Sequence, residues 1–337
     1  KSEKVGGLIG QHPIEPVISC FWDVQTSGTT SSESGKGKNT SEMKTKSTFT
    51  EAGWNFNFVW AIDPTINDGY PYIYDRGLVI SSGLEPIDTD GDGYRNISCY
   101  SHLHWVSQND SSWSWNYELD NNINADSTWI LSGGMGFTPI GNNQTSYSGK
   151  FEGNGFAIDS LYINYLGING TGLFGVTSEA AMSNIGITNA YMTGGFNVGG
   201  LVGMNDNSSK VINCYSKGNI SGTYRYVGGL VGNNSSSVIT NCFSTCSVSV
   251  GKFVGGLVGY SPSSTLTNCY STGRVSGETY LGGLVGLNIS SSVRKCFWDT
   301  QTSGQGTSYE GTGKTTAEMK TKLTFTSAGW NFDTTWA

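Results

Sequence analysis

The sequence has 337 residues, of which 13% are charged and 48 are glycine, and its formal net charge is -7. No Lys/Arg cluster is present to neutralise a run of phosphates, so the composition argues against nucleic-acid binding. No apolar run approaches the ~18 to 20 residues that cross a bilayer as a helix, so we expect no membrane span. The composition favours a β-rich, turn-rich protein over a helical cytosolic enzyme.

The chain begins at Lys1 without a methionine or an apolar leader. We therefore expect either that a signal peptide has been removed or that the sequence is a piece of a longer protein. Sequons of the type Asn-x-Ser/Thr, such as those at Asn207 and Asn288, are compatible with a glycosylated extracellular protein.

Residues 1–61 restate residues 277–337. The segment from Val5 to Trp60 aligns without a gap to the segment from Leu281 to Trp336, at a constant offset of 276 residues. This repeat predicts that residues 1–61 are the terminal turn and cap of a preceding module. A lone GGLIG turn cannot bury a core by itself, so it must pack on a neighbouring module or on another chain.

Residues 62–98 are expected to be a linker that carries a loop of alternating aspartates, DTDGDGYRN. Oxygen ligands at loop positions 1, 3 and 5, with glycine at position 6, are typical of calcium loops. The pattern predicts a structural calcium ion held by Asp88, Asp90, Asp92, Tyr94 and Asn96.

The loop departs from the EF-hand at position 12, where Cys99 stands instead of a bidentate glutamate. It is therefore closer to the DxDxDG loops of dockerins and thrombospondin-type repeats, and a missing ligand must come from elsewhere. The alternative is a plain Asp/Gly turn without a metal.

Residues 99–296 carry a short repeat. The string GGLVG starts at Gly199, Gly228, Gly255 and Gly282, with spacings of 29, 27 and 27 residues. Runs such as VINCYS, bounded by Gly, Ser or Asn, are strand signals with turn punctuation. We therefore predict an all-β fold, a right-handed parallel β-helix (solenoid) with short helical and Trp-rich caps, in which equivalent turns stack.

Stacking of equivalent turns places like residues in ladders. One ladder holds the cysteines, a second the aromatic residues that follow them, and a third the asparagines that precede them: Cys214, Cys242, Cys269 and Cys296; Tyr215, Phe243, Tyr270 and Phe297; Asn213, Asn241 and Asn268. We expect the cysteines to face inward, because cysteine behaves as a small buried hydrophobe. The asparagines, which tolerate left-handed turns, should mark a corner.

The seven cysteines are expected to be mostly buried free thiols. Four of them occupy one repeat position, where stacked neighbours have parallel Cα–Cβ vectors that suit a disulfide poorly. Cys20 is the ladder member of the first partial module. Cys99 and Cys246 lie outside the pattern and either pair or stay free.

Residues 297–337 are predicted to be a cap that contains a helix. Thr315-x-x-Glu318, and Asn39-x-x-Glu42 in the first copy, resemble capping boxes, and Gly329 and Gly53 follow the expected helix end. An amphipathic helix followed by a Trp-rich strand suits the closure of the open apolar end of a β-helix. The alternative is that exposed aromatic side chains bind glycans.

Catalytic patterns are scarce, so we predict that the chain is not an enzyme. Between Gly195 and Lys295 the acids are Asp206 and Glu278, which is too few for the Asp clusters of β-helical lyases and hydrolases. His102 and His104 are two residues apart, a poor spacing for two metal ligands on a helix.

The recurring VGGLVG, NCYS and TGRVSG strings resemble the GLUG motif of bacterial and archaeal surface proteins. Further blocks, including FEGNGFAIDSLYIN and CFWDTQTSG, extend the resemblance over most of the chain. It implies an extracellular solenoid of the adhesin, sheath or surface-layer type, or a passive stalk in a large surface protease.

Two functions follow as hypotheses. The first is a structural, possibly adhesive, component of an extracellular surface assembly, a filament, sheath or surface layer, in which modules join head to tail with copies of the chain. The second is a carbohydrate-binding adhesin or polysaccharide-active β-helix that uses the aromatic ladder, or exposed tryptophans such as Trp298 and Trp330, as a sugar platform.

Overall fold

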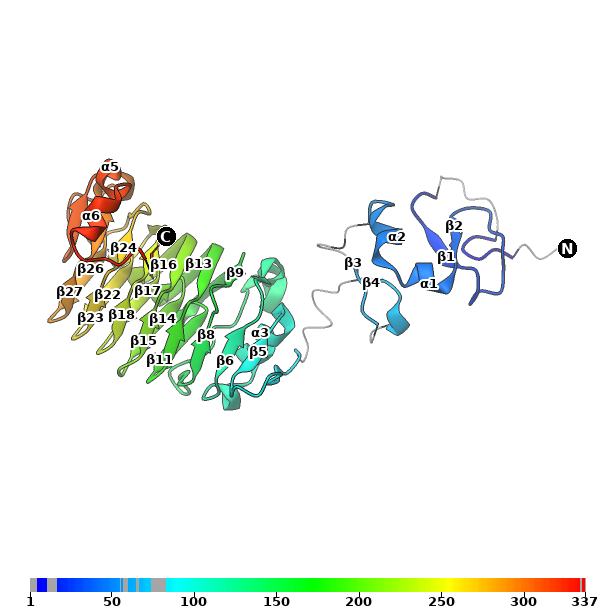
Figure 1. Ribbon diagram of the computed structural model, residues 1–337, viewed down its shortest axis with the longest axis horizontal. Coiled ribbons are helices and arrows are strands. Elements are labelled where there is room, and N and C mark those ends of the chain that lie inside the picture. The colour runs from blue at the N-terminus through cyan, green and yellow to red at the C-terminus, as the bar shows by residue number, and fades with distance from the viewer. Residues whose placement is uncertain are drawn as a thin grey trace. The chain divides into compact units, whose positions relative to one another are not determined.

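The computed structural model (Figure 1) describes residues 5–10, 17–54, 56, 60–64, 67–73, 83–333 and 335–336. The chain divides into two compact units, Lys1–Val79 and Ile80–Ala337. The division falls inside residues 62–98, the segment for which a linker is expected. Within the described residues no helix is long and apolar enough to cross a membrane.

The second unit is a stack of parallel coils built from three sheets. The eight-stranded sheet contains β5 (Arg95–Ile97), β6 (Tyr117–Leu119), β8 (Lys150–Glu152), β12 (Ala181–Ser183), β15 (Lys210–Ile212), β18 (Val238–Thr240), β23 (Thr265–Thr267) and β27 (Ser292–Arg294). The five-stranded sheet contains β11 (Phe174–Ser178), β14 (Val202–Asp206), β17 (Val231–Asn234), β22 (Val258–Pro262) and β26 (Val285–Ile289).

The twelve-stranded sheet bends round a corner of the coils. Its strands are β7 (Ile123–Asn124), β9 (Ala157–Asp159), β10 (Tyr162–Thr171), β13 (Gly186–Gly199), β16 (Tyr215–Gly228), β19 (Phe243–Ser244), β20 (Ser247–Ser249), β21 (Lys252–Gly255), β24 (Tyr270–Ser271), β25 (Thr279–Gly282), β28 (Phe297–Asp299) and β29 (Thr312–Lys314). The helices of this unit are α3 (Tyr100–Gln108), α4 (Thr300–Ser303), α5 (Thr316–Met319) and α6 (Lys322–Thr326), with 3-10 helices η3 (Asp110–Ser112) and η4 (Asp126–Gly134).

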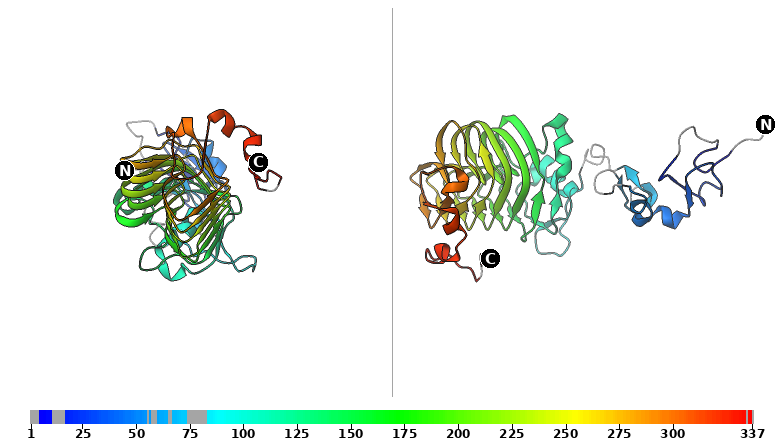
Figure 2. Two further views of the ribbon diagram at one scale, coloured as in Figure 1. Left: turned by 90° about the vertical axis from the view of Figure 1, so that its left-hand side faces the viewer. Right: turned by 90° about the horizontal axis from the view of Figure 1, so that it is seen from above.

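The coils stack in register along the sequence repeat. Val202 of β14 pairs with Val231 of β17, which pairs with Val258 of β22 and then with Val285 of β26, all in parallel. The predicted parallel β-helix is thereby confirmed, and Figure 2 shows the successive coils along one axis.

The glycine pair of each GGLVG string is required by the close approach of neighbouring backbones. A Cβ at Gly228 would lie 2.7 Å from the backbone nitrogen of Gly259 in the next coil, and a Cβ at Gly229 would lie 2.3 Å from the carbonyl oxygen of Gly256. Any side chain at these positions would force the coils apart.

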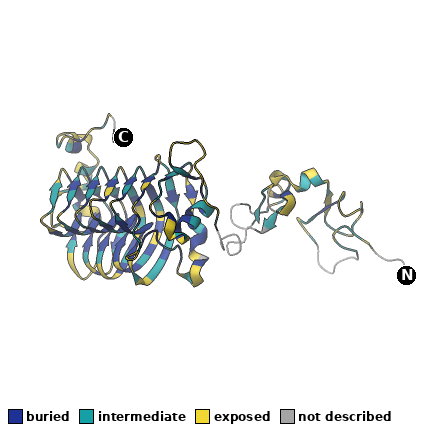
Figure 3. Cartoon of the chain, turned by 90° about the horizontal axis from the view of Figure 1, so that it is seen from below, coloured by how far each residue is buried: buried dark blue, intermediate teal, exposed yellow. Residues whose placement is uncertain are grey.

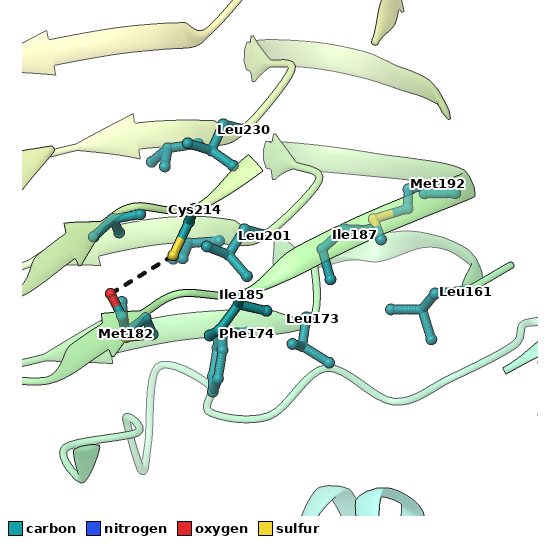
Figure 4. Close-up of a cluster of buried hydrophobic side chains, with 14 of the residues drawn as sticks. Leu161, Leu173, Phe174, Met182, Ile185, Ile187, Met192, Leu201, Cys214 and Leu230 are labelled. Atoms are coloured by element: carbon teal, nitrogen blue, oxygen red, sulfur yellow. Dashed lines mark hydrogen bonds between the residues drawn. The ribbon is translucent and has the colours of Figure 1, made fainter. Parts of the chain in front are cut away.

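The interior is a continuous apolar column, whose buried residues are dark blue in Figure 3 and are shown in part in Figure 4. The four ladder cysteines are buried in it and are free thiols, as expected. Cys214 Sγ donates to the carbonyl oxygen of Met182 at 3.7 Å. On the outer face the rings of Tyr215 and Phe243, and of Phe243 and Tyr270, stack at 5.0 Å with 4° between their planes.

The asparagine ladder forms the predicted corner. Asn213, Asn241 and Asn268 have φ values of 54°, 55° and 52°, in the left-handed region. Their amides bond along the stack: Asn268 Nδ2 donates to Asn241 Oδ1 at 3.1 Å, Asn241 Nδ2 to Asn213 Oδ1 at 3.1 Å, Asn213 Nδ2 to Asn184 Oδ1 at 2.9 Å, and Asn184 Nδ2 to Glu152 Oε1 at 2.8 Å. A carboxylate thus ends the chain of amides on its acceptor side.

Helix α3 covers the core at the N-terminal end of the coils. Leu103 and Val106 are fully buried and join the same cluster as Ile97 of the first coil. His102 and His104, whose spacing argued against a metal site, lie in this helix. The sequence SHLHWV of this helix did not indicate that the helix would cover the end of the core.

The C-terminal tail differs from the predicted cap. Two short helices, α5 and α6, replace the single expected helix, because the chain is extended at Thr321, which has φ -107° and ψ 115°. The capping box of Thr315 and Glu318 is present, and Gly329 has φ 82°.

Residues 307–314 of the predicted cap lie on the last coil, since the N–H of Gly283 donates to the carbonyl oxygen of Thr307 and β29 pairs with β28, whereas α5 and α6 pack beside the coils. Phe325 and Trp330 pack on Phe297 and Tyr270, which belong to the outer aromatic row, in a cluster separate from the core. Figure 2, left, shows this tail outside the outline of the coils. The outer rings offer the tail more apolar contact than the narrow end of the column.

The first unit reproduces the terminal coil and the tail. Its elements are β1 (Phe21–Asp23), β2 (Lys36–Lys38), α1 (Thr40–Met43), α2 (Lys46–Thr50), β3 (Trp60–Ala61), η1 (Asn67–Gly69) and β4 (Tyr72–Ile73). Strands β1 and β2 pair in parallel, as β28 and β29 do. Leu8, however, is 40% exposed, whereas its counterpart Leu284 is fully buried between coils.

Replacement of Asn241 tests the corner ladder. We expect Asn241→Ala to lower the free energy of unfolding by about 2 kcal/mol, because it removes the ladder hydrogen bonds and places alanine in the left-handed region. Asn241→Gly loses the same hydrogen bonds without the backbone strain, so it should cost about 1 kcal/mol less. Urea unfolding measures both. Equal losses for the two variants would contradict the role given to the backbone conformation.

Candidate functional site

The aspartate loop brings three carboxylates together ahead of β5. Ligand atoms of Asp88, Asp90 and Asp92 lie within 4.8 Å of one another, and all three side chains are exposed. The backbone N–H groups of Gly91 and Gly93 donate to Asp88 at 2.7 and 3.0 Å. The Gly91 bond outweighs the opposing effect of desolvation and, with Gly93, holds the pKa of Asp88 below its ordinary value.

Asn96 points from the loop into the first coils. Its Oδ1 accepts from the N–H and the hydroxyl of Thr89, at 2.8 and 2.9 Å. Its Nδ2 donates to Glu118 and to Asp120, at 2.8 and 3.0 Å. Tyr94 is half-buried and follows the carboxylates directly, so its backbone oxygen is the group that could face a cation. The structure thus gathers the three aspartates, while Asn96 ties the loop to the coils.

The carboxylates of the N-terminal coils act as hydrogen-bond acceptors between coils. Glu152 accepts from Ser183 Oγ at 2.7 Å as well as from Asn184. Asp159 accepts from Thr188 and Asn189, and these bonds outweigh desolvation and lower the pKa of Asp159. Each of these acids is held by neutral donors from the next coil, which differs from a pair of carboxylates facing across an open groove.

Cys99 and His102 form a titratable pair at the N-terminal cap of α3. Burial would raise the pKa of the half-buried Cys99 thiol, but hydrogen bonds with His102 outweigh it and lower that pKa. The same bond to Cys99 raises the pKa of His102 against the effect of desolvation. The spacing of three residues between Cys99 and His102, at the start of a helix, is the one sign of this contact in the sequence.

The tryptophans suggested as a sugar platform are not available for it. Trp298 and Trp330 are 6% and 4% exposed, because Trp298 lies against Gly283 and Trp330 lies within the tail cluster. Their indole N–H groups donate to the carbonyl oxygens of Gln305 and Lys295.

A different aromatic row lies on the outer surface. Tyr226 and Phe253 lie 5.4 Å apart, and Phe253 and Tyr280 stack at 4.7 Å. Tyr280 is 58% exposed. All three have positive φ and stand two residues before a glycine pair. That fixed spacing could have identified the row in the sequence.

Three consecutive coils match the family model of the GLUG motif, over residues 194–221, 223–249 and 254–276. A stretch of 89 residues, 26% of the chain, is 43% identical to halomucin of Haloquadratum walsbyi and covers 1% of that protein. A stretch of 91 residues, also 26% of the chain, is 32% identical to a "Putative Gly-rich membrane protein" of Evansella cellulosilytica and covers 10% of it. The chain thus spans a small part of the length of these relatives.

Among solved structures, the coils resemble a "putative immunoglobulin A1 protease" from Bacteroides ovatus. The TM-score is 0.51 and the identity is 19%, over 65% of this chain and 67% of the other. At this identity the likeness concerns the fold alone.

The thiols give a test of the Cys99–His102 contact. In the native protein we expect an alkylating reagent to modify Cys20 and Cys99 and to spare the five buried cysteines. Because the pKa of Cys99 is lowered, its reaction should reach half its maximal rate below the ordinary thiol pKa of 9.0.

Removal of the imidazole by His102→Gln should shift that profile to higher pH. Alkylation followed over pH by peptide mass spectrometry measures the rate at each cysteine, and the rate at Cys20 in the other unit is the internal control. An unchanged Cys99 profile in His102→Gln would contradict the contact.

Proposed function

The chain is a GLUG-repeat protein, and we propose that it is a structural component of an extracellular surface assembly whose β-helix modules join head to tail. The names of two relatives, a halomucin and a membrane protein, favour a location at the cell surface. We propose no catalytic activity for the chain, because Glu152 and Asp159 of its coils accept hydrogen bonds from neighbouring coils.

The observation that carries the proposal is the lone coil of the first unit. In the second unit, the corresponding coil is covered by its predecessor: the backbone N–H groups of Leu257 and Val258 both donate to the carbonyl oxygen of Leu284. Its counterpart, Leu8, is 40% exposed. An apolar coil surface of this kind is stabilised by another coil.

The last coil of the second unit leaves one strand edge open, because residues 307–314 already bond to β26 and β28. Strand β27 ends its sheet. The N–H of Ser292 and the carbonyl of Arg294 bond to the preceding coil, so the backbone groups of Val293 between them point away from it. Open edges of this kind pair with a further strand. A coil of the next copy would satisfy this edge and bury the face around Leu8.

A second candidate function rests on the outer row of Tyr226, Phe253 and Tyr280. Stacked aromatic rings with an exposed edge suit the apolar faces of sugar rings. The row therefore favours glycan adhesion as the alternative, at a place different from Trp298 and Trp330.

Assembly is tested by electron microscopy and sedimentation velocity. We expect elongated, end-to-end particles whose fraction rises with concentration, and we expect Leu8→Glu to weaken association at least ten-fold, because it places a charge in the coil face. Leu323→Glu is the matched control, since Leu323 is 70% exposed and lies outside this face. A compact monomer at all concentrations, or equal effects of both variants, would overturn the proposal.

We also propose that the aspartate loop binds calcium, with Asp88, Asp90, Asp92, the backbone oxygen of Tyr94 and Asn96 as the ligand set. The clustered carboxylates ahead of β5 support it. Because Asn96 Oδ1 accepts bonds from Thr89, this residue would contribute through water or after reorientation. Its role would be to stiffen the entry to the first coil.

Calcium should raise the unfolding temperature. Saturation at about 100 times the dissociation constant corresponds to about 2.7 kcal/mol of stabilisation. EDTA should reverse the effect and Asp90→Asn should remove most of it, whereas Asp110→Asn, an exposed acid outside the loop, should not. Differential scanning calorimetry measures these shifts. A Ca²⁺-independent unfolding temperature would refute the site.

A further inference from the structure

A cavity of about 710 Å³ lies beside the C-terminal tail. The outer rings of the coils, including Tyr270, form one wall, and Phe325, Trp330 and Trp336 of the tail form another. Asp299 contributes a carboxylate and Lys320 an ammonium group. The cavity therefore combines aromatic walls with one acid and nearby cations.

Only one of the two carboxylate oxygens of Asp299 accepts hydrogen bonds from the described residues. Its Oδ1 accepts from the N–H groups of Gln301 and Thr302 and from the hydroxyl of Thr316, at 2.9, 3.0 and 2.9 Å. Its Oδ2 accepts no hydrogen bond from the part of the chain that the structure describes. This oxygen is free to accept a donor from an occupant of the cavity.

The first unit contains the same groups. Every residue that lines the cavity from Asp299 onwards has an identical residue 276 positions earlier. Asp23 corresponds to Asp299, Lys44 to Lys320 and Trp60 to Trp336. The stacking of Trp336 on Trp330 at 4.4 Å matches that of Trp60 on Trp54 at 4.1 Å. The two tails therefore present the same chemistry.

In the first unit, these groups have an occupant. The hydroxyl of Tyr70 donates to Oδ2 of Asp23 at 2.7 Å, and Lys44 Nζ lies 5.0 Å from the centre of the Tyr70 ring. Desolvation would raise the pKa of Asp23, but the bond from Tyr70, with those from Thr40 and two backbone amides, outweighs it and lowers the pKa to about 2.

The segment that carries Tyr70 also adds a strand. Strand β4 pairs antiparallel with β3, with Trp60 opposite Ile73 and Ala61 opposite Tyr72. The sequence Asn-Asp-Gly-Tyr-Pro-Tyr-Ile of residues 67–73 occurs once in the 337 residues. The tail of the second unit thus has the same receiving groups as the tail that precedes residues 67–73.

We propose that the cavity beside the C-terminal tail is a docking site for a tyrosine-bearing peptide strand of the type of residues 67–73, supplied by the following module. Its tyrosine hydroxyl donates to Oδ2 of Asp299, its ring lies beside Lys320, and its next residues pair with the backbone at Trp336. This is recognition by strand addition, with a pocket that selects one side chain. It rests on the proposed function for the source of the strand and names the surface by which successive modules join.

A synthetic peptide of residues 62–73 tests the site on the full chain. We expect saturable binding of one peptide per chain, followed by calorimetry and by tryptophan fluorescence, since Trp336 lines the cavity. A peptide with phenylalanine at the position of Tyr70 should bind about ten-fold more weakly, because a hydrogen bond to a charged group is lost. This comparison needs no change to the protein.

Asp299→Asn should weaken the binding of the tyrosine peptide about ten-fold and leave that of the phenylalanine peptide unchanged. Asp333→Asn, an exposed acid of the same tail, is the matched control with the same change in charge. Absence of saturable binding at millimolar peptide, or equal binding of the two peptides, would overturn the docking site. Assembly seen by microscopy without peptide binding would leave head-to-tail joining in place and reject this surface for it.

Discussion

The structure depends on the pairing of every coil with the coils before and after it. A parallel stack aligns equivalent residues, so each position of the 27 to 29-residue repeat must suit its own copies as neighbours. Glycine pairs at Gly228 and Gly229 allow the backbones to approach. The amides of Asn213 and Asn241 satisfy each other at the corner, in a backbone conformation that asparagine tolerates. A slip by one residue would break both arrangements.

An inner coil pairs with neighbours on both sides, whereas an end of the stack has a side that needs another partner. The ends of the stack are therefore where the proposed joining of modules would occur. Helix α3 covers the core at one end. At the other, β27 keeps an open edge, and the tail with Trp330 lies on the outer aromatic row. In the coil of the first unit, Leu8 is 40% exposed. These ends are the surfaces on which the proposed joining of modules depends.

The repeat strings by themselves predicted the stacked coils, the inward-facing cysteines and the corner formed by asparagines. Periodicity achieves this because a stacked repeat has a single way to align its copies, and residues such as Cys242 and Asn241 have few roles that suit a ladder. The internal copy of residues 277–337 likewise predicted that residues 1–61 repeat a terminal turn and its cap. The aspartate loop could also be recognised in the sequence, since alternate acids around glycine form a local pattern.

Only the tertiary structure decided which segments cover which side chains. The sequence placed the tail over the end of the coils, but its aromatic side chains pack on the outer row at Tyr270 and Phe297, which arises only when coils stack. The sequence suggested Trp298 and Trp330 as part of a sugar platform, but both side chains are buried. The cavity at Asp299 and its filled counterpart at Asp23 depend on contacts between distant segments. Local patterns fix the conformation of each coil, whereas the burial of a ring or a carboxylate depends on its neighbours in space.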